Sequence, residues 1–332
     1  VLFPSPDTII ICSLDNSTLT YNIQIYKNGH VRTVPTQGKP IGLYYHPPYL
    51  FYGNTLDRHL HSITLTTPTL TVTRLDGRYK HIHGNRYDIF GGIMDRRGKD
   101  VMYVDWSEYG MIWNIGYIDT GVEGIRCRVV KDCGALYPES VCCVEDTVYA
   151  LGAQGTVTEL KGEESAESLK PTRVIHLCEA ARKQHQAWLN NTPEPMIMRR
   201  NYGDYNVMSC IGNMLIIGHP GKIYLMDRLK MEVITSAPTV PPDTVPCEIM
   251  PILMRAGKRS IVCVKNYLDG SMLFYLYQPD GLQYVGKHKS TGQIHTAVYL
   301  GGDYIGILGK GKALEVLKVS KTSKLSVSQP TP

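Results

Sequence analysis

Two pairs of histidines come closest, by residue type and spacing, to a catalytic or metal-binding set. One residue separates His59 from His61, and one separates His81 from His83. Because side chains alternate between the two faces of a β-strand, each spacing places two imidazoles on one face. Two such pairs on neighbouring strands offer ligands that Zn²⁺ or another transition metal accepts. No cysteine or acidic cluster adjoins either pair, so we expect exposed strand histidines, no bound metal and no cofactor.

A glycine- and lysine-rich stretch from Gly306 to Lys312 matches most of a phosphate-binding loop. Such a loop ends in Ser or Thr, which holds Mg²⁺, and it opens a helix whose N-terminus faces the phosphates. Here Ala313 follows instead, and residues 313–319 read as an alternating strand. The stretch therefore predicts a hairpin turn and no nucleotide site.

Other catalytic signatures are absent from the sequence. No Gly-x-Ser-x-Gly elbow of a serine hydrolase occurs. Cys142 and Cys143 are adjacent, and adjacent residues on a strand point to opposite faces, so we expect no bond between them. A Cys/His nucleophile pair is neither nominated nor excluded by the sequence. We therefore predict that the protein is not an enzyme.

Short strands joined by tight turns must position any functional residue. The clearest unit runs from Gly212 to Thr235. Its predicted strands are Met214–Ile217, Ile223–Met226 and Met231–Thr235. Such a meander is too small to bury both of its faces alone, so it needs copies of itself beside it.

Units of this kind recur along the chain, about seven of them at a period of roughly 40 residues, which is the spacing of propeller blades. Gly110–Asn114 and Gly221–Asp227 resemble the third-strand signature of WD40 repeats, in which a Gly turn precedes an alternating strand ending in Trp-Asp. Gly155–Leu160 is a weaker match. The chain is therefore similar to the WD40-like β-propeller superfamily, with no specific member identified.

The resemblance implies an all-β fold, a β-propeller of about seven four-stranded antiparallel blades with one helical insertion. We expect a single domain over residues 1–320. The tail, residues 321–332, is rich in Ser, Thr and Lys and is predicted to be disordered.

One region, residues 161–204, interrupts the strand pattern and is predicted to be an inserted polar loop followed by a helix. Gly162–Ser168 is acidic and lacks aromatic residues, so we expect it to be mobile. Leu177–Asn191 is predicted to be a helix that ends before Thr192-Pro193. Its apolar stripe consists of Leu177, Cys178, Ala181, Trp188 and Leu189.

A helix with such a stripe must bury it, either on its own blades or on a partner. Aromatic and arginine side chains often anchor protein interfaces, and here they are close together in the sequence. The candidate binding residues are Trp188, Leu189, Arg182, Lys183, Arg199 and Arg200.

The composition is that of an ordinary globular protein, with 43% hydrophobic and 20% charged residues. No apolar run is long enough for a membrane helix, and no signal peptide is visible in the first residues. The net charge of +5 over 332 residues is mild. The basic residues are scattered, which does not indicate nucleic-acid binding but leaves it open.

Nine cysteines, several in apolar strand-like runs, favour a reduced, intracellular protein of the cytoplasm or nucleus. We expect a non-enzymatic protein–protein interaction scaffold, a subunit of a multi-subunit assembly. Two alternatives stay open. One is an enzyme that uses the propeller channel, with a metal on the histidine pairs. The other is a secreted or cell-attachment propeller, for which the sequons at Asn16 and Asn190 would carry glycans.

Overall fold

The computed structural model describes most of the chain. The described ranges are 2–5, 8–15, 17–54, 56–57, 59–67, 69–78, 94–97, 100–106, 113–120, 124–130, 138–152, 155–163, 165–190, 207–239, 242–244, 246–254, 259–266, 268–278, 281–289, 294–301, 304–309, 315–319 and 325–328.

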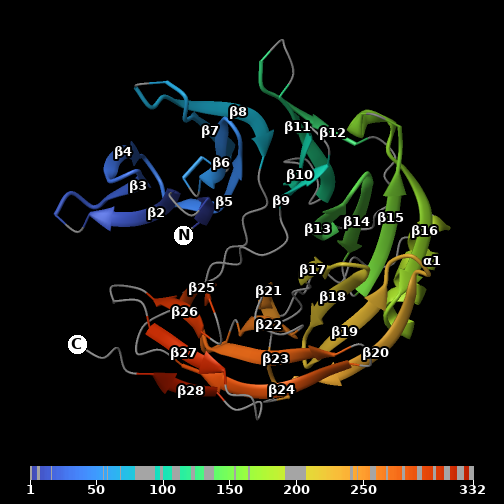
Figure 1. The fold of residues 1–332 in the computed structure, drawn as a ribbon. Helices are drawn as coiled ribbons and strands as arrows, with labels where there is room; N and C mark the ends of the chain where they lie inside the picture. The colour runs from blue at the N-terminus through green and yellow to red at the C-terminus, as the bar shows by residue number, and fades with distance from the viewer. Residues whose placement is uncertain are drawn as a thin grey trace. The chain divides into compact units, whose positions relative to one another are not determined.

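Seven four-stranded sheets fill the described residues, and each uses four strands that follow one another in the sequence (Figure 1). In six of the sheets every neighbouring pair is antiparallel. The all-β prediction is confirmed. Among the described residues, no helix is long and apolar enough to cross a membrane.

The chain divides into two compact units, and the sheet β13–β16 contributes residues to both. The strands of the first unit are β1 (Leu2–Ser5), β2 (Thr8–Asp15), β3 (Thr20–Lys27), β4 (His30–Thr36), β5 (Pro40–His46), β6 (Tyr49–Asn54), β7 (His59–Thr64), β8 (Val72–Arg78), β9 (Met94–Arg97), β10 (Asp100–Trp106), β11 (Trp113–Asp119) and β12 (Arg126–Val129). The shared sheet and its helices are β13 (Pro138–Val144), β14 (Thr147–Gly152), β15 (Thr156–Lys161), a 3₁₀ turn (Ala166–Ser168), β16 (Lys170–His176) and α1 (Glu179–Leu189).

The second unit contains three complete sheets and α1. Its remaining strands are β17 (Val207–Ile211), β18 (Met214–His219), β19 (Lys222–Asp227), β20 (Glu232–Pro238), β21 (Pro246–Met254), β22 (Arg259–Asn266), β23 (Met272–Gln278), β24 (Gly281–His288), β25 (Ile294–Gly301), β26 (Tyr304–Gly309), β27 (Glu315–Val319) and β28 (Leu325–Ser328).

Turn chemistry explains the shortest connections. Asn28 and Gly29 link β3 to β4 with φ angles of 49° and 77°, the positive values that a two-residue hairpin turn needs. The strands then pair from Lys27 opposite His30 onward. The predicted strands around Met214, Ile223 and Met231 correspond to β18, β19 and β20, each extended or shifted by a residue or more.

The apolar cores lie between successive sheets. In the first unit, one cluster draws on β2, β3 and β4 and on β6 and β7, with Ile23, Leu50 and Ile63 completely buried. In the second unit, another joins β17–β19 to β21–β23 through residues such as Ile216 and Val264. Alternating apolar side chains on facing sheets thus hold neighbouring sheets together, as in sheet-on-sheet packing generally.

One buried arginine ties two sheets of the first unit together. Arg97, at the end of β9, is only 3% exposed. Its guanidinium donates to the backbone oxygens of Asp146 (2.7 Å), Gly162 (2.8 Å) and Glu163 (2.6 Å). The neighbouring carboxylate of Asp100, also buried, accepts from the Ala166 backbone N–H at 3.0 Å. We call Arg97 and Asp100, with these contacts, the arginine brace.

The segment 161–204 differs from its sequence-based description. Lys170–His176 forms β16, the fourth strand of its sheet, so only part of the segment stands outside the sheets. Gly162, Glu163 and Ala166 belong to the segment that was expected to be mobile, and the arginine brace holds them. The acidic composition of this loop suggested mobility. Composition does not show that the backbone of the loop accepts hydrogen bonds from one buried charged side chain and donates to another.

The tail also differs from the prediction of disorder over residues 321–332. Leu325–Ser328 forms β28 and pairs with β27 from Val319 to Val316. Leu325 and Val327 alternate with serines, a period-2 pattern that suits a strand. The stretch that resembles a phosphate loop begins within β26, which is the antiparallel partner of β27. The predicted turn itself, at residues 310–314, lies outside the described residues.

Candidate functional site

The helix α1 begins where a glycine permits a close approach. After β16, the Leu177 backbone N–H donates to the oxygen of Gly155 at 2.9 Å. A side chain at Gly155 would lie 3.2 Å from the Leu177 side chain, and its φ of 92° is one that glycine adopts readily. The contact fixes the turn into α1, which starts at Glu179, two residues later than the sequence predicts.

Residues spaced four apart form the inward side of α1. Ala181 is completely buried and His185 is 7% exposed, as expected for positions on the same helix face. The His185 Nδ1 lies 3.0 Å from Nε2 of His176 on β16, and the two ring centroids are 5.1 Å apart. One neutral imidazole must donate to the other at this distance, so the pair fastens α1 to β16.

Burial sets the protonation of this imidazole pair. It lowers the pKa of His176, and the positive charge of Arg182 lowers it further. Burial also lowers the pKa of His185, with His176 as the second cause. Both rings are therefore held neutral near pH 7, which is the state that allows the hydrogen bond between them.

The outward side of α1 is charged. Arg182 and Lys183 are exposed, and Arg182 donates to both carboxylate oxygens of Glu179, at 2.6 and 2.8 Å. This hydrogen bond lowers the pKa of Glu179. The bond is exposed and contributes little to stability, but it orients the guanidinium along the helix surface.

The structure brings together only part of the sequence-predicted site. Arg182 and Lys183 share the exposed side of α1. The side chains of Trp188 and Leu189, and the whole of Arg199 and Arg200, lie outside the described residues. The sequence analysis missed His185 as an inward-facing residue, although its position four residues after Ala181 was a signal that could have found it.

A tyrosine of the second unit lies near the start of α1. Tyr224 on β19 is 8% exposed, and its ring meets the His219 ring edge-on with 6.3 Å between the ring centroids. Burial raises the pKa of Tyr224, and the nearby Cys178 raises it further. The corresponding side chain in the other predicted match, Trp113, lies outside the described residues.

The first histidine pair, His59 and His61, makes hydrogen bonds with neighbouring residues. His61 Nε2 lies 2.9 Å from the Asp57 carboxylate, and His59 Nδ1 lies 2.6 Å from the Asp57 backbone oxygen. Both rings thus contact Asp57, and His61 is buried, at 8% exposed, where the sequence analysis expects an exposed histidine. Nε2 of His59 accepts from Arg74 at 2.9 Å, which occupies the lone pair that a metal would need.

The second pair, His81 and His83, lies outside the described residues. Within the part of the chain that the structure describes, no group of three or more His, Cys, Asp or Glu side chains is placed to hold a metal ion. None of the seven cysteines whose side chains are described there is in a disulfide. Burial raises the pKa of one of them, Cys12, to about 11, which is opposite to the shift that an activated thiol requires.

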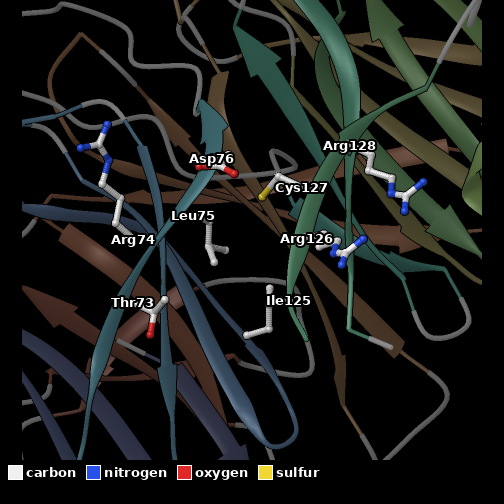
Figure 2. A pocket seen from close by; sticks show the side chains of 8 residues that line it. All are labelled: Thr73, Arg74, Leu75, Asp76, Ile125, Arg126, Cys127 and Arg128. Carbon is white, nitrogen blue, oxygen red and sulfur yellow. The ribbon is translucent and has the colours of Figure 1, made fainter. Parts of the chain in front are cut away.

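A groove lies between two strands of the first unit. β8 and β12 are each the last strand at one edge of their sheets, and a cavity of about 420 Å³ lies between them, lined by residues 73–76 and 125–128. Figure 2 shows the Cys127 side chain pointing toward β8, with Leu75 and Ile125 between the strands. The Arg126 and Arg128 side chains point away from β8, on the opposite face of their sheet.

Comparison with known proteins gives structural matches alone. No protein-family model and no curated protein sequence matches this chain. BamB from Moraxella catarrhalis is similar in structure with a TM-score of 0.56 and 12% identity, over 95% of this chain and 80% of BamB. The WD40 β-propeller domain of Doa1 has a TM-score of 0.55 and 11% identity, over 96% of this chain and 92% of that domain.

An enzyme is among the similar structures. The dihydro-heme d1 dehydrogenase NirN matches with a TM-score of 0.60 and 11% identity, over 98% of this chain but 64% of NirN. At these identities the matches establish a fold and leave chemistry open. The fold is similar to that of these β-propellers, and the comparisons single out no particular family.

Proposed function

We propose that the protein is a non-enzymatic protein–protein interaction scaffold, a propeller of seven closed blades that works as a subunit of a larger complex inside the cell. The seven four-stranded sheets and the similarity to propellers support the blade number. The scaffold role is supported by the residues: His59 and His61 are engaged with Asp57 and Arg74, and the Cys12 thiol is not activated.

The observation that carries the proposal is the two-sided character of α1. Its inner side is fixed by Ala181 and by the bond between His185 and His176. Its outer side presents Arg182 and Lys183 to solvent. A helix that is already held by its own unit can offer a rigid outer face at little entropic cost, which favours binding.

The partner that this face fits is a protein surface with carboxylates opposite Lys183 and Arg182. The Glu179–Arg182 pair is exposed, so an incoming carboxylate can compete for the guanidinium without first breaking a buried contact. Trp188 and Leu189, at the end of the same helix, are proposed as the apolar anchors, and Arg199 and Arg200 as further basic contacts.

The test begins with the proteins that co-purify with the full chain. Each is expressed separately and titrated against the wild type and the double variant Arg182→Glu/Lys183→Glu by calorimetry. We expect the double variant to bind its partner at least about tenfold more weakly, as charge reversal at an interface does. Lys230→Glu, an exposed charge change in the turn before β20, is the matched control and should leave the affinity unchanged.

A second variant distinguishes an interaction element from a structural one. Replacing Glu179–Leu189 with a Gly/Ser linker leaves β16 in place. Loss of the partner with an unchanged melting temperature supports the proposal. A sharply lower melting temperature would identify α1 as a brace of its own unit, and unchanged binding would contradict the proposed site.

A further inference from the structure

The strand β4 is an open edge of its sheet. It is the fourth strand in the order β1–β2–β3–β4, so within the sheet it has a neighbour on one side only. Its seven residues, His30–Thr36, pair with β3 without a register shift. By contrast, the pairings of the fourth strands β8, β20 and β24 contain a register shift, and β12 and β28 are each four residues long. Bulges and short length protect sheet edges against added strands, and β4 has neither protection.

The backbone groups of Val31 and Thr33 point outward along this edge. The two-residue turn at Asn28-Gly29 makes Lys27 and His30 a hydrogen-bonded pair. Bonded and non-bonded pairs alternate along an antiparallel ladder, so the N–H and C=O of Val31 and Thr33 face away from β3. Within the described part of the chain, neither residue makes a hydrogen bond outside its own sheet.

Pro35 supports this assignment independently. It follows Val31 and Thr33 at the same spacing of two along β4. A proline has no N–H, and a strand accepts it where its nitrogen faces away from the neighbouring strand. An added strand can therefore pair with both backbone groups of Val31 and Thr33 and with the oxygen of Pro35, where the pairing would end.

The two faces of β4 differ in chemistry. On the open face, Val31 is 53% exposed and Thr33 is also exposed. On the other face, Val34 packs in the buried cluster between the sheets β1–β4 and β5–β8. Arg32 on that face donates to the backbone oxygen of Leu65 at 3.0 Å, so its hydrogen bonds serve the fold. The open face thus offers two β-branched side chains, one apolar and one with a hydroxyl group.

Positive charge lies at the hairpin end of the edge. Lys27 and His30 are exposed and directly opposite each other, so their side chains share a face. Among the described residues, neither makes an ion pair or a side-chain hydrogen bond. A carboxylate on an added strand opposite His30 would meet the ammonium group of Lys27 and a ring N–H of His30.

We propose that the edge of β4 binds an extended segment of a partner protein as an added antiparallel strand, with β-branched residues opposite Val31 and Thr33 and a carboxylate opposite His30. β-Branched residues and Thr–Thr pairs are favourable across strands. In such complexes the backbone bonds provide affinity and the side chains provide specificity. This site lies in the first unit and does not depend on the α1 surface.

A second copy of the chain fits this edge less well than a different protein. Self-pairing that uses both Val31 and Thr33 sets them opposite each other in the two copies, with Arg32 opposite Arg32 between them. Like charges directly opposite each other destabilise a strand pair. The favoured occupant therefore carries no basic residue at the position facing Arg32.

The direct experiment is fluorescence anisotropy with the full chain and the labelled synthetic peptide Gly-Ser-Val-Ser-Thr-Ser-Val-Glu-Gly. In the proposed register its Thr pairs with Thr33, its second Val pairs with Val31, and its Glu lies opposite His30. We expect saturable binding at peptide concentrations up to the millimolar range.

Two methylated peptides isolate the backbone contacts. N-methylation of the Thr and the second Val removes the N–H groups that donate to the oxygens of Thr33 and Val31. This peptide should bind at least about tenfold more weakly. N-methylation of the two Ser residues that flank the Thr is the matched control. Their N–H groups face away from β4, so this peptide should bind like the parent.

Two variants of the protein test the edge and its charge. Val31→Pro removes an outward N–H at a position equivalent to that of Pro35, so it should weaken binding and keep the circular dichroism spectrum. Lys27→Glu should weaken binding several-fold, and a peptide with Gln in place of Glu should remove most of this difference. Lys230→Glu, in the second unit, is the control and should bind the peptide like the wild type.

Several results would overturn the proposal. Absence of saturable binding would show that the edge does not accept this segment, and equal binding of the two methylated peptides would exclude backbone pairing. Both measurements use the wild-type chain, so they decide the matter even if Val31→Pro fails to fold. A dimer in sedimentation experiments that dissociates in Val31→Pro would show that a second copy occupies the edge instead.

Discussion

Arginines occupy two contrasting environments in the first unit. Arg97 is 3% exposed and donates to three backbone oxygens of other segments. Arg126 and Arg128 are exposed on an edge strand, and the ion pair of Arg128 with Glu167 is 3.8 Å long. A buried guanidinium must have its donors satisfied by the fold itself, whereas an exposed one can also donate to water.

The difference separates an arginine that holds the fold together from arginines that lie at the exposed surface. The arginine brace fastens Gly162, Glu163 and Ala166, and the donors of Arg97 face acceptors that are fixed in the backbone. The ion pair of Arg128 with Glu167 is exposed and long, so it contributes little to the stability of the fold. Burial and the number of fixed acceptors, rather than residue type, therefore indicate which basic residues belong to which role.

The largest effect should come from the buried arginine. Arg97→Ala leaves three backbone oxygens without their donor, and we expect the free energy of unfolding to fall by roughly 3–5 kcal/mol. Chemical denaturation monitored by circular dichroism measures it. Arg128→Ala is the matched control and should change stability by no more than about 0.5 kcal/mol. Similar losses of unfolding free energy in the two variants would contradict the distinction between the two arginine environments.

The imidazole pair of α1 extends the comparison to titratable groups. Burial lowers the folded-state pKa of His176 and His185, so the unfolded state binds protons first as pH falls. Their contribution is present above the unfolded pKa of about 6.5 and is lost as pH decreases below it. Hydrogen exchange of the α1 amides should therefore accelerate as the pH is lowered through this unfolded pKa, beyond the intrinsic effect of pH.

The variant His185→Phe checks this assignment. It keeps a buried ring without a titratable nitrogen, so the additional pH dependence of α1 exchange should largely disappear. Arg182, whose positive charge lowers the pKa of His176, remains in this variant, so its effect on His176 is the same in both proteins. Persistence of the full pH dependence would place its origin elsewhere.

A smaller effect is expected at the turn between β22 and β23. Burial by itself would raise the pKa of Asp269, but hydrogen bonds from Lys287 and Ser271 outweigh it and lower the pKa to about 2. Asp269→Asn should reduce the free energy of unfolding by about 1 kcal/mol at pH 7, since the Lys287 pair is partly exposed. The contribution is present above about pH 4 and is lost toward pH 2, so the wild type and variant should converge in acid.

The smallest expected effect is that of metal removal. We predict that the purified protein carries no stoichiometric metal and that chelation leaves its melting temperature unchanged, because the nitrogen of His59 that faces Arg74 is already occupied. Elemental analysis measures this. One zinc or copper per chain, lost when His59, His61, His81 and His83 are replaced, would favour an enzyme over a scaffold.

Local sequence patterns predicted much of the fold. The Asn28-Gly29 hairpin and the strands that became β18 and β19 were predictable because turn residues and apolar runs act over a few positions. The sequence did not reveal the strand β16, because the segment lacks a clear apolar face. Its exposed residues include Lys170, Pro171 and Thr172. An outermost strand is specified by its neighbour as much as by its own sequence.

The candidate site was predictable to a smaller extent. Helix periodicity located α1 and the exposed Arg182 and Lys183. The His176–His185 contact joins a strand to a helix, and the groove lies between β8 and β12, which three strands separate in the sequence. Periodicity describes one element at a time, so it cannot show which elements meet.

Hydrogen–deuterium exchange of the full chain, with and without a co-purified partner, tests the central claim that the protein is an interaction scaffold with a docking face on α1. We predict that binding protects the amides of α1, residues 179–189, and that Arg182→Glu/Lys183→Glu abolishes this protection while the arginine brace at residues 162–168 exchanges as before. Partner binding that leaves the α1 amides unprotected would contradict the claim.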